Sequence, residues 1–266
     1  MQLDVCVAGL TGWTGQAVAR AIHDATDMSL VSGVSRRASG SDAGAILDDH
    51  AWDVPVYGTV EAALTRANVL VDYTSHLAVK ANVMTALDHG VSVVVGASGL
   101  SAADYDEIDR VARDRDVGVI AAGNYSLTAT LAATLALLAA RYLPHWEIVD
   151  YASDKKLDSP SGTARELAER LGSPRSGGLE GLPSGSEEGQ ASSARGQRVA
   201  GTAIHSVRVP GFSLSTEVVF GLPGERLSVR HDAGDSAEPY VAGTLLAIRN
   251  VRGSSGLTRG LESLLL

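Results

Sequence analysis

Two adjacent lysines, Lys155 and Lys156, stand a few residues before a Pro-Ser-Gly-Thr turn in the stretch YASDKKLDSPSGTARELAERL. A lysine ammonium can donate a proton and can stabilise negative charge as it develops. The turn precedes a predicted helix, whose first N–H groups and hydroxyls form a ready anion site. The stretch therefore predicts a site that binds an anion and protonates a neighbouring atom, without a histidine.

The residues predicted to bind the anion are Ser161, Gly162 and Thr163. An ordinary helix cap uses the same residue types, so the turn by itself does not distinguish ligand binding from capping. A lysine seven residues before Thr163 favours ligand binding. Lys155 has three open roles: it lowers the pKa of Lys156 by like-charge repulsion, binds a substrate carboxylate, or is only a solvated loop residue.

A second candidate site is the sequence VAGLTGWTGQAV, which has GxxGxxG spacing between a predicted strand and a predicted helix. A turn without side chains lets backbone N–H groups and a helix N-terminus approach a pyrophosphate. The alternative is a tight turn that only packs the helix on the strand. If the turn binds a dinucleotide, the predicted contacts are Gly9, Thr11, Gly12, Trp13, Thr14 and Gly15.

The segment GVSRRASG, after the second predicted strand, bears on which cofactor would bind. An acidic residue at this place bonds the ribose hydroxyls of NAD, whereas arginine accommodates the extra phosphate of NADP. Ser35 stands where the acid is sought, and Arg36 and Arg37 follow it. Two guanidinium groups and a hydroxyl suit a phosphate. The segment predicts NADPH, with NADH as the alternative, unless both arginines are only solvated.

Three short loops, YTSH, GASG and GNYS, follow later predicted strands, at the ends where open α/β sheets bind ligands. Their small residues leave room for a nicotinamide ring. His76 is either a cofactor contact or a surface residue at a helix start, and we favour the surface residue. The predicted cofactor contacts in these loops are Thr74, Gly96, Ser98, Asn124 and Tyr125.

These loops need a regular sheet to position them. Short apolar runs alternate with helical segments over residues 1–126, beginning with LDVCVAGL and GQAVARAIHDA. This βαβ rhythm predicts an α/β fold with a doubly wound, Rossmann-type parallel sheet. The apolar stretch LTATLAATLALLAARYL, which comes next, suits a buried helix better than a membrane span.

The pattern changes in residues 127–238, which we expect to form a second domain. The segments AIHSVRVPG, STEVVFGLPG and RLSVRHDA alternate apolar and polar residues, which predicts an antiparallel sheet with one solvated or interface face. Residues 172–200 are rich in Gly, Ser and Pro and predict a flexible loop. The segment PYVAGTLLAIRNVRG predicts a final helix that returns to the first domain.

The composition of the 266 residues is that of a globular protein, and it narrows the partners. A net charge of -9 argues against binding nucleic acid, which usually needs a basic face. The single cysteine, Cys6, excludes a disulfide within the chain and is expected to be a buried thiol. We see no signal peptide. We expect a cytoplasmic protein with no membrane partner and no metal site.

In order along the chain, the glycine turn, GASG, GNYS and DKKLDSPSGTA resemble the dihydrodipicolinate reductase family, also called 4-hydroxy-tetrahydrodipicolinate reductase. The similarity continues through AIHSVRVPG, EVVFGLPGERLSVRHDA and AGTLLAIRNV. It implies an NADPH-binding domain over residues 1–126, completed by a C-terminal helix over residues 239–266. It also implies a substrate and oligomerisation domain with a mixed sheet, a homotetramer, and reduction of a cyclic imine or enamine next to a carboxylate in the lysine pathway.

The family motif reads Glu-x-His-His-x-x-Lys-x-Asp-(Ala or Ser)-Pro-Ser-Gly-Thr-Ala, and this chain departs from it. Asp150 falls on the glutamate, Ala152 and Ser153 on the two histidines, and Lys156 on the lysine. The resemblance implies that Lys156 is the catalytic proton donor. Ala152 cannot replace the first histidine, which assists proton delivery. Ser153 offers only a neutral hydrogen bond to the substrate carboxylate that the second histidine helps to hold.

Three functions compete on these observations. The first is the family's own NADPH-dependent reductase activity. The second is reduction of another cyclic or acyclic imine, as in specialised metabolism. The missing histidines favour the second function over the first, whereas the near full-length similarity favours the first. The third is a nonenzymatic sensor that kept the cofactor fold. Lys156 and the anion turn count against a sensor, because a sensor needs no acid beside an anion site.

Overall fold

The computed structural model describes residues 2–172 and 195–265. The chain divides into two compact units, which we describe separately: unit 1 comprises Met1–Leu127 and Ala237–Leu266, and unit 2 comprises Thr128–Ser236. The family domains implied by the sequence have nearly the same limits.

Unit 1 alternates strands and helices, with its last elements returning from the C-terminus. Its elements are β1 (Leu3–Ala8), α1 (Trp13–Asp24), β2 (Met28–Val34), α2 (Ala43–Leu47), β3 (Val56–Tyr57), α3 (Val60–Ala63), the 3-10 helix η1 (Leu64–Arg66), β4 (Val69–Asp72), α4 (Val79–Asp88), β5 (Ser92–Val95), α5 (Ala102–Asp114), β6 (Gly118–Ala121), α8 (Glu238–Val251), β12 (Gly256–Arg259) and α9 (Glu262–Leu265).

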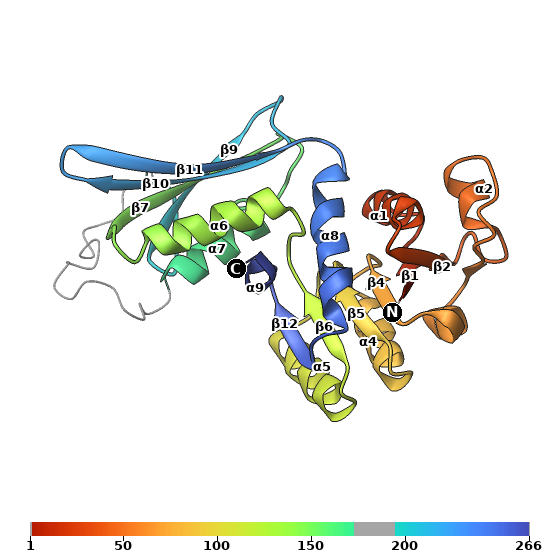
Figure 1. Cartoon of the computed structure of the whole chain (residues 1–266). Coiled ribbons are helices and arrows are strands. Elements are labelled where there is room, and N and C mark those ends of the chain that lie inside the picture. The colour runs from red at the N-terminus through yellow and green to blue at the C-terminus, as the bar shows by residue number, and fades with distance from the viewer. Residues whose placement is uncertain (1, 173–194, 266) are drawn as a thin grey trace. The chain divides into compact units, whose positions relative to one another are not determined.

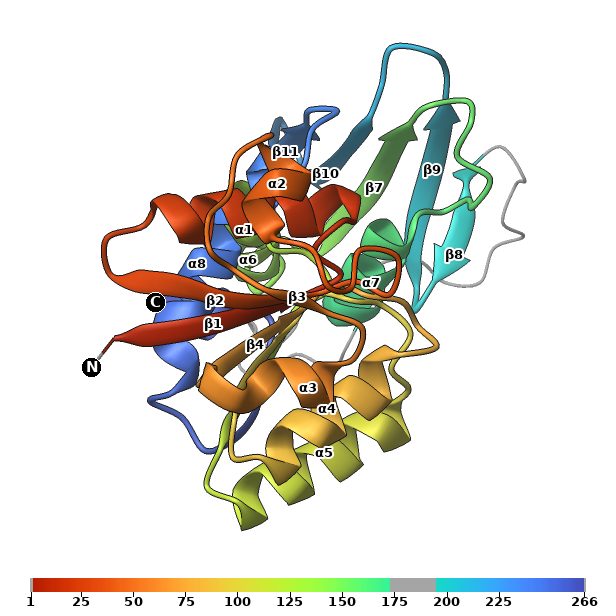
Figure 2. The ribbon, with the colours of Figure 1, turned by 90° about the vertical axis from the view of Figure 1, so that its right-hand side faces the viewer.

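The strands of unit 1 form one sheet in the order β12-β6-β5-β4-β1-β2-β3, with every neighbouring pair parallel. Alternate residues of β1 face opposite layers: Val5 and Val7 pack with α1 and α8, whereas Cys6 and Ala8 pack with α3, α4 and α5. Figure 2 shows these two helix layers on either side of the sheet. Burial on both faces explains why the strands are continuous apolar runs. The predicted doubly wound parallel sheet is confirmed.

The sequence predicted one detail of unit 1 correctly and another wrongly. Cys6 is fully buried as expected, and burial raises the pKa of its thiol to about 12. The helix near the C-terminus is present as α8, but the expectation that it extends over residues 239–266 is wrong. The helix ends at Val251, and the chain turns through Gly256, whose φ is +86°, to add β12 beside β6.

The described residues of unit 2 form one sheet and two long helices. Its elements are α6 (Leu127–Ala139), β7 (His145–Ala152), α7 (Gly162–Gly172), β8 (Gln197–Val199), β9 (Thr202–Arg208), β10 (Leu214–Leu222) and β11 (Glu225–Ala233). The sheet order is β11-β10-β7-β9-β8. Helices α6 and α7 cover one face of the sheet (Figure 1), where Ile148, Ile204 and Phe220 form its core with residues of both helices.

The sheet of unit 2 is mixed, as the family resemblance implied. The purely antiparallel sheet predicted from the alternating segments is wrong at one boundary, because β9 runs parallel to β7. The error arises because β7 lies between β9 and β10, so these consecutive strands are not neighbours. Strands β10 and β11 do form the antiparallel hairpin that their local pattern predicts.

Helix α6 and the segment that follows α7 correct two further expectations. The stretch predicted to be a buried helix is helical, but Leu131, Leu135 and Leu138 are about half exposed on it, whereas Ala136 is buried. Within the predicted loop of residues 172–200, β8 forms an edge strand, and residues 173–194 lie outside the described residues.

Among the described residues, no helix is both long and apolar enough to cross a bilayer. The cytoplasmic location expected from the sequence stays a prediction.

Candidate active site

The glycine turn after β1 is built by close contacts within the backbone. Gly9 has φ +84°, and a Cβ on it would lie 2.5 Å from the carbonyl oxygen of Tyr73. A Cβ on Gly15 would overlap the carbonyl oxygen of Gly9. The Gly12 amide donates to that same oxygen at 2.8 Å, and Gly12 is the N-cap of α1. The first and third glycines are thus required for packing, which leaves the second for the approach of a phosphate.

The turn lies at the point in the sheet where the order in which strands are added reverses. Strands β2 and β4 pair with β1 on its two sides, so the loops after β1 and β4 meet at the edge where such sheets bind nucleotides. The amide of Tyr73 donates to Ala8 at 2.9 Å and ties these two loops together. The amides of Trp13 and Thr14 belong to the first turn of α1, where N–H groups have no acceptor within the helix.

The loop after β4 is held by a buried carboxylate that the sequence analysis did not single out. Asp72 is fully buried and accepts from the Thr74 amide at 2.8 Å, from Thr74 Oγ1 at 2.6 Å and from Asn82 Nδ2 at 2.8 Å. Burial raises the pKa of Asp72, and these hydrogen bonds oppose the rise. An aspartate ending a strand was the available signal. Thr74, a predicted cofactor contact, is therefore fixed in place.

The residues predicted to choose the cofactor gather after β1 and β2. The hydroxyls of Thr11 and Ser35 are 3.0 Å apart and hydrogen-bonded. Arg36 and Arg37 are exposed, and in the described part of the chain neither guanidinium has a hydrogen bond or ion pair. Two hydroxyls beside two available guanidinium groups offer donors to a phosphate.

Several residues of the loops after β5 and β6 pack inside the fold, although the sequence predicted that they contact the cofactor. A Cβ on Gly96 would overlap the ring of Tyr73, and Gly99, with φ +109°, packs against His76. Tyr125 is 2% exposed, and its hydroxyl donates to the carbonyl of Val95 at 2.8 Å. Burial raises the pKa of Tyr125 well above its ordinary value. The phenol of Tyr125 faces the core, so only its backbone remains to touch a cofactor.

The other predicted contacts in these loops remain accessible. Ser98 and His76 are exposed, as expected for a surface histidine. Asn124 is partly exposed, and its side-chain oxygen accepts from the Ser126 amide at 2.8 Å, which shapes the loop. The Asn124 side-chain oxygen therefore stabilises its own loop.

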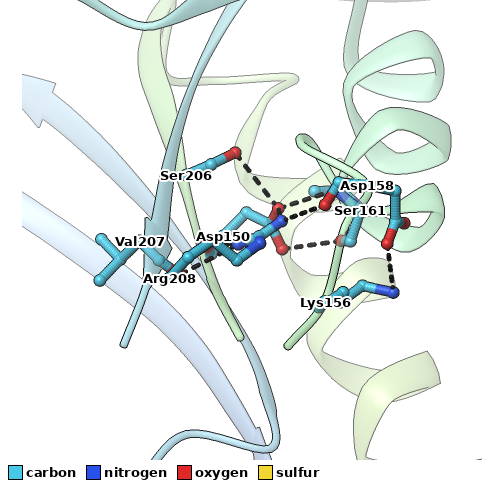
Figure 3. A network of polar contacts seen from close by, with 8 residues as sticks. Asp150, Lys156, Asp158, Ser161, Ser206, Val207 and Arg208 are labelled. Atoms are coloured by element: carbon cyan, nitrogen blue, oxygen red, sulfur yellow. Dashed lines mark hydrogen bonds and ion pairs between the residues drawn. The ribbon is translucent and has the colours of Figure 1, made fainter. Parts of the chain in front are cut away.

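The lysine loop of unit 2 follows β7. Lys156 Nζ lies 2.9 Å from Asp158 Oδ1, and the Lys156 side chain is 34% exposed (Figure 3). The hydrogen bond from Lys156 lowers the pKa of Asp158. Lys155 is exposed, and its amide donates to Ser153 Oγ, which donates to Asp154 at 3.1 Å. One lysine is thus held by a carboxylate, and the other is in solvent.

Some polar groups of the predicted anion turn are hydrogen-bonded within the protein, and others face solvent. Ser161 is buried, and its amide and hydroxyl each donate to Asp150 at 2.7 Å. The Ser161 oxygen also accepts from the Ala164 amide at 3.3 Å, as a helix cap does. Gly162 and Thr163 lie at the first turn of α7 with partial or full exposure. The Ser161 amide and hydroxyl are therefore occupied by Asp150, whereas Gly162 and Thr163 stay exposed at the start of α7, and their binding of an anion stays a prediction.

A buried ion pair underlies the whole loop, and the sequence analysis missed one partner. Asp150 is fully buried, and Arg208 Nη2 donates to its Oδ2 at 2.7 Å from the neighbouring strand β9. Arg208 also donates to the carbonyls of Asp150, Val207 and Asp158 (Figure 3). No local pattern pairs these residues, because they are 58 positions apart.

Ala152 and Ser153, at the end of β7, differ in exposure. Ala152 is fully buried on the face of β7 that also carries Ile148 and Asp150, whereas Ser153 is partly exposed. Neither side chain can accept or release a proton near neutral pH, so the ionisable groups of the loop are its two lysines and two aspartates.

Comparison with known proteins gives one family for the whole chain. A family model described as dihydrodipicolinate reductase, N-terminus, matches residues 3–125, and one described as dihydrodipicolinate reductase, C-terminus, matches residues 126–265. The 4-hydroxy-tetrahydrodipicolinate reductase of Desulfitobacterium hafniense is 39% identical, covering 99% of each chain. That of Moorella thermoacetica is 38% identical, covering 98% of this chain and 97% of the other.

A solved structure gives the same result. The dipicolinate-bound dihydrodipicolinate reductase from Paenisporosarcina sp. TG-14 has a TM-score of 0.82 and 29% identity, covering 99% of both chains. The sheet order and glycine turn define a dinucleotide-binding protein, of the kind that takes a nicotinamide cofactor in its Rossmann domain. The chain belongs to the dihydrodipicolinate reductase family, which confirms the resemblance found in its sequence.

Proposed function

We propose that this protein is an NADPH-dependent 4-hydroxy-tetrahydrodipicolinate reductase, which reduces a C=N bond next to a carboxylate. The observation that carries the proposal is the position of Lys156 in the loop that leads into the anion turn of α7. Support comes from full-length relatives at 38–39% identity whose names state this activity. The dipicolinate bound by a relative is a ring with two carboxylates, and such a ligand suits this combination.

The chemistry requires a proton at nitrogen. When bound, the cofactor supplies the hydride that adds to the carbon of the C=N bond. Lys156 then donates a proton from Nζ to the substrate nitrogen, where electron density accumulates. An ammonium has three N–H donors, and Asp158 occupies one of them at 2.9 Å, so others remain for the substrate. Such a donor typically contributes about 10²–10⁴-fold to the rate.

The substrate carboxylate is assigned to the start of α7. The amides of Gly162 and Thr163, the Thr163 hydroxyl and the positive end of the helix dipole all favour an anion there. Lys155 is exposed and reaches the same solvent-facing loop, so it adds a mobile positive charge for a carboxylate. Ser153 contributes at most a neutral hydrogen bond, in the position of the family's second histidine.

The cofactor preference is assigned to NADPH. The Thr11 and Ser35 hydroxyls and the exposed Arg36 and Arg37 supply the donors for the 2′-phosphate, and no acidic side chain ends β2. Gly12, Trp13 and Thr14 at the start of α1 supply amides for the pyrophosphate.

The predicted homotetramer is assigned to the sheet of unit 2. Helices α6 and α7 cover one face, and the other face carries Tyr151, Glu217 and Arg230. Tyr151 donates to Glu217 at 3.1 Å, and the Arg230 guanidinium stacks over the Tyr151 ring at 4.9 Å. A preorganised, mixed apolar and polar face of this kind suits packing against a second copy. Light scattering that gave a monomer at micromolar concentration would contradict this assembly.

A second candidate function is reduction of a different imine. Ala152 and Ser153, in place of two histidines, favour it because they remove a proton-transfer group and a cationic carboxylate ligand. A nonenzymatic cofactor sensor remains the third alternative.

The experiment that separates these functions is NADPH oxidation with a panel of cyclic imino acids, including freshly made 4-hydroxy-tetrahydrodipicolinate. Turnover that is fastest with 4-hydroxy-tetrahydrodipicolinate supports the proposal. Faster turnover with another imine supports the second candidate. Tight NADPH binding with no turnover of any imine supports the sensor.

A further inference from the structure

We propose that Arg208 is a positioning residue for this reaction: paired with Asp150, it holds both ends of the loop that carries Lys156. The inference rests on the proposed function, because it assigns Arg208 an effect on the reductase step. Arg208 lies on β9, outside the lysine loop, and it acts through other residues rather than on the substrate.

The first connection is to the end of the loop near the acid. Arg208 Nη2 donates to the carbonyl of Asp158 at 2.9 Å, and the carboxylate of Asp158 binds Lys156 at 2.9 Å. The backbone and the side chain of one residue thus link the guanidinium to the proton donor (Figure 3). A displacement of Arg208 therefore shifts the carboxylate that orients the Lys156 ammonium.

The second connection is to the anion turn. The same Arg208 Nη2 donates to Asp150 Oδ2 at 2.7 Å, and Asp150 accepts both the amide and the hydroxyl of Ser161 at 2.7 Å. Ser161 caps α7 through the Ala164 amide. The buried carboxylate therefore sets the first turn of α7, where Gly162 and Thr163 face the ligand.

The geometry requires an arginine and not merely a positive charge. The guanidinium makes four hydrogen bonds, to the Asp150 carboxylate and to the carbonyls of Asp150, Val207 and Asp158. A lysine ammonium is a compact point charge that can keep the ion pair but cannot span this fork of acceptors. Arg208 Nε has no hydrogen-bond partner, the one such buried side-chain atom among the described residues. Stability alone does not account for a donor left unpaired.

The first variant is Arg208→Lys, which leaves the buried Asp150 charge paired and so favours a folded protein. We expect kcat to fall roughly 10- to 100-fold, because small misplacements of reacting groups cost about this much. We expect NADPH affinity, measured by fluorescence titration, to stay unchanged, since no cofactor contact is altered. Arg198→Ala is the matched control: its guanidinium bonds a backbone carbonyl on the same sheet and has no contact with the loop.

A double-mutant cycle tests whether Arg208 acts through Lys156. If it does, Arg208→Lys should lower the kcat of Lys156→Ala by a smaller factor than it lowers the kcat of the wild type, because only the effect through the anion turn remains. Independent structural damage would instead multiply the two losses. Hydrogen exchange at the Ser161 amide gives a second readout, and we expect faster exchange in Arg208→Lys than in Arg198→Ala.

The outcomes distinguish this inference from the proposed function. An active wild-type protein whose kcat is unchanged in Arg208→Lys, or whose double mutant shows fully multiplied losses, overturns the role of Arg208 alone. A wild-type protein without turnover of any imine overturns the proposed function and this inference with it. A lowered kcat with unchanged NADPH affinity and a non-multiplicative double mutant supports the inference.

Discussion

The carboxylate of Asp158 lies 2.9 Å from the ammonium of Lys156, two residues earlier in the same loop. In the proposed reaction this pair would fix the proton donor of the loop without a histidine. The ammonium is held in one orientation by a partner that faces solvent, and it keeps donors available for a substrate nitrogen. The contact also makes the loop sensitive to pH.

The pair predicts a pH-dependent contribution to stability. The pKa of Asp158 is lowered from its ordinary value of 3.8, chiefly by the hydrogen bond from Lys156. The contribution is therefore complete above pH 3.8 and is lost as the pH falls through the lowered pKa. Because both side chains are partly exposed, we expect only about 0.2–1 kcal/mol. Thermal unfolding of the wild type and Asp158→Asn should differ at pH 7 and converge at strongly acidic pH; an equal difference at both contradicts the assignment.

The glycine turn predicts a strong dependence on one glycine. Gly15→Ala places a Cβ against the carbonyl oxygen of Gly9, so the turn must shift or the helix must move. We expect a loss of about 1–3 kcal/mol in the free energy of unfolding and weaker NADPH binding. Gly221→Ala is the matched control, because its Cβ would meet no atom within 4 Å and its φ is not positive. Equal denaturation midpoints for the two variants would exclude the packing role of Gly15.

The buried carboxylate after β4 predicts a coupled loss of stability and cofactor affinity. Asp72→Ala leaves the amide and hydroxyl of Thr74 and the Asn82 side chain without their acceptor. Unsatisfied buried donors cost about 1–3 kcal/mol. We expect a lower denaturation midpoint and weaker NADPH binding, measured by chemical denaturation and titration. Full NADPH affinity in a folded Asp72→Ala protein would show that the Thr74 loop does not contact the cofactor.

The arginines after β2 predict the choice of cofactor. Removing a charge-assisted hydrogen bond to the 2′-phosphate in Arg36→Ala should weaken NADPH binding by about 1–3 kcal/mol. NADH lacks that phosphate, so its affinity should not change. Isothermal titration with both cofactors measures the two effects, and Arg37→Ala shows which guanidinium matters more. Equal affinities for NADPH and NADH in the wild type, unchanged in both variants, would reject the phosphate site.

The strands and helices of unit 1 could be predicted because each follows from the pattern of apolar residues in its own segment. Buried strands such as β4 and β5 are continuous apolar runs, and the glycine turn after β1 has a spacing with a physical cause. Strand β12 was missed because four residues, GLTR, carry no periodicity and gain their structure from pairing with β6. The parallel β7–β9 pair was missed because the order of strands is not a local property.

The candidate site divides in the same way. Lys156 and the start of α7 could be predicted, since residue type and spacing define the chemistry there. Arg208 could not, because its partner lies 58 positions away in sequence. The same limit explains Tyr125 and Ser161, whose side chains the motifs assigned to ligands. The fold instead turns the first to the carbonyl of Val95 and the second to Asp150.

Lys156 is the proposed donor of a proton to the nitrogen of a C=N bond in an NADPH-dependent reduction. The most direct test is turnover of 4-hydroxy-tetrahydrodipicolinate by the wild type, Lys156→Ala and Lys155→Ala, with NADPH affinity measured in parallel. We expect Lys156→Ala to lower kcat by about 10²–10⁴-fold with unchanged NADPH affinity, and Lys155→Ala mainly to raise KM. Near wild-type turnover by Lys156→Ala would contradict the claim and move the acid to another residue.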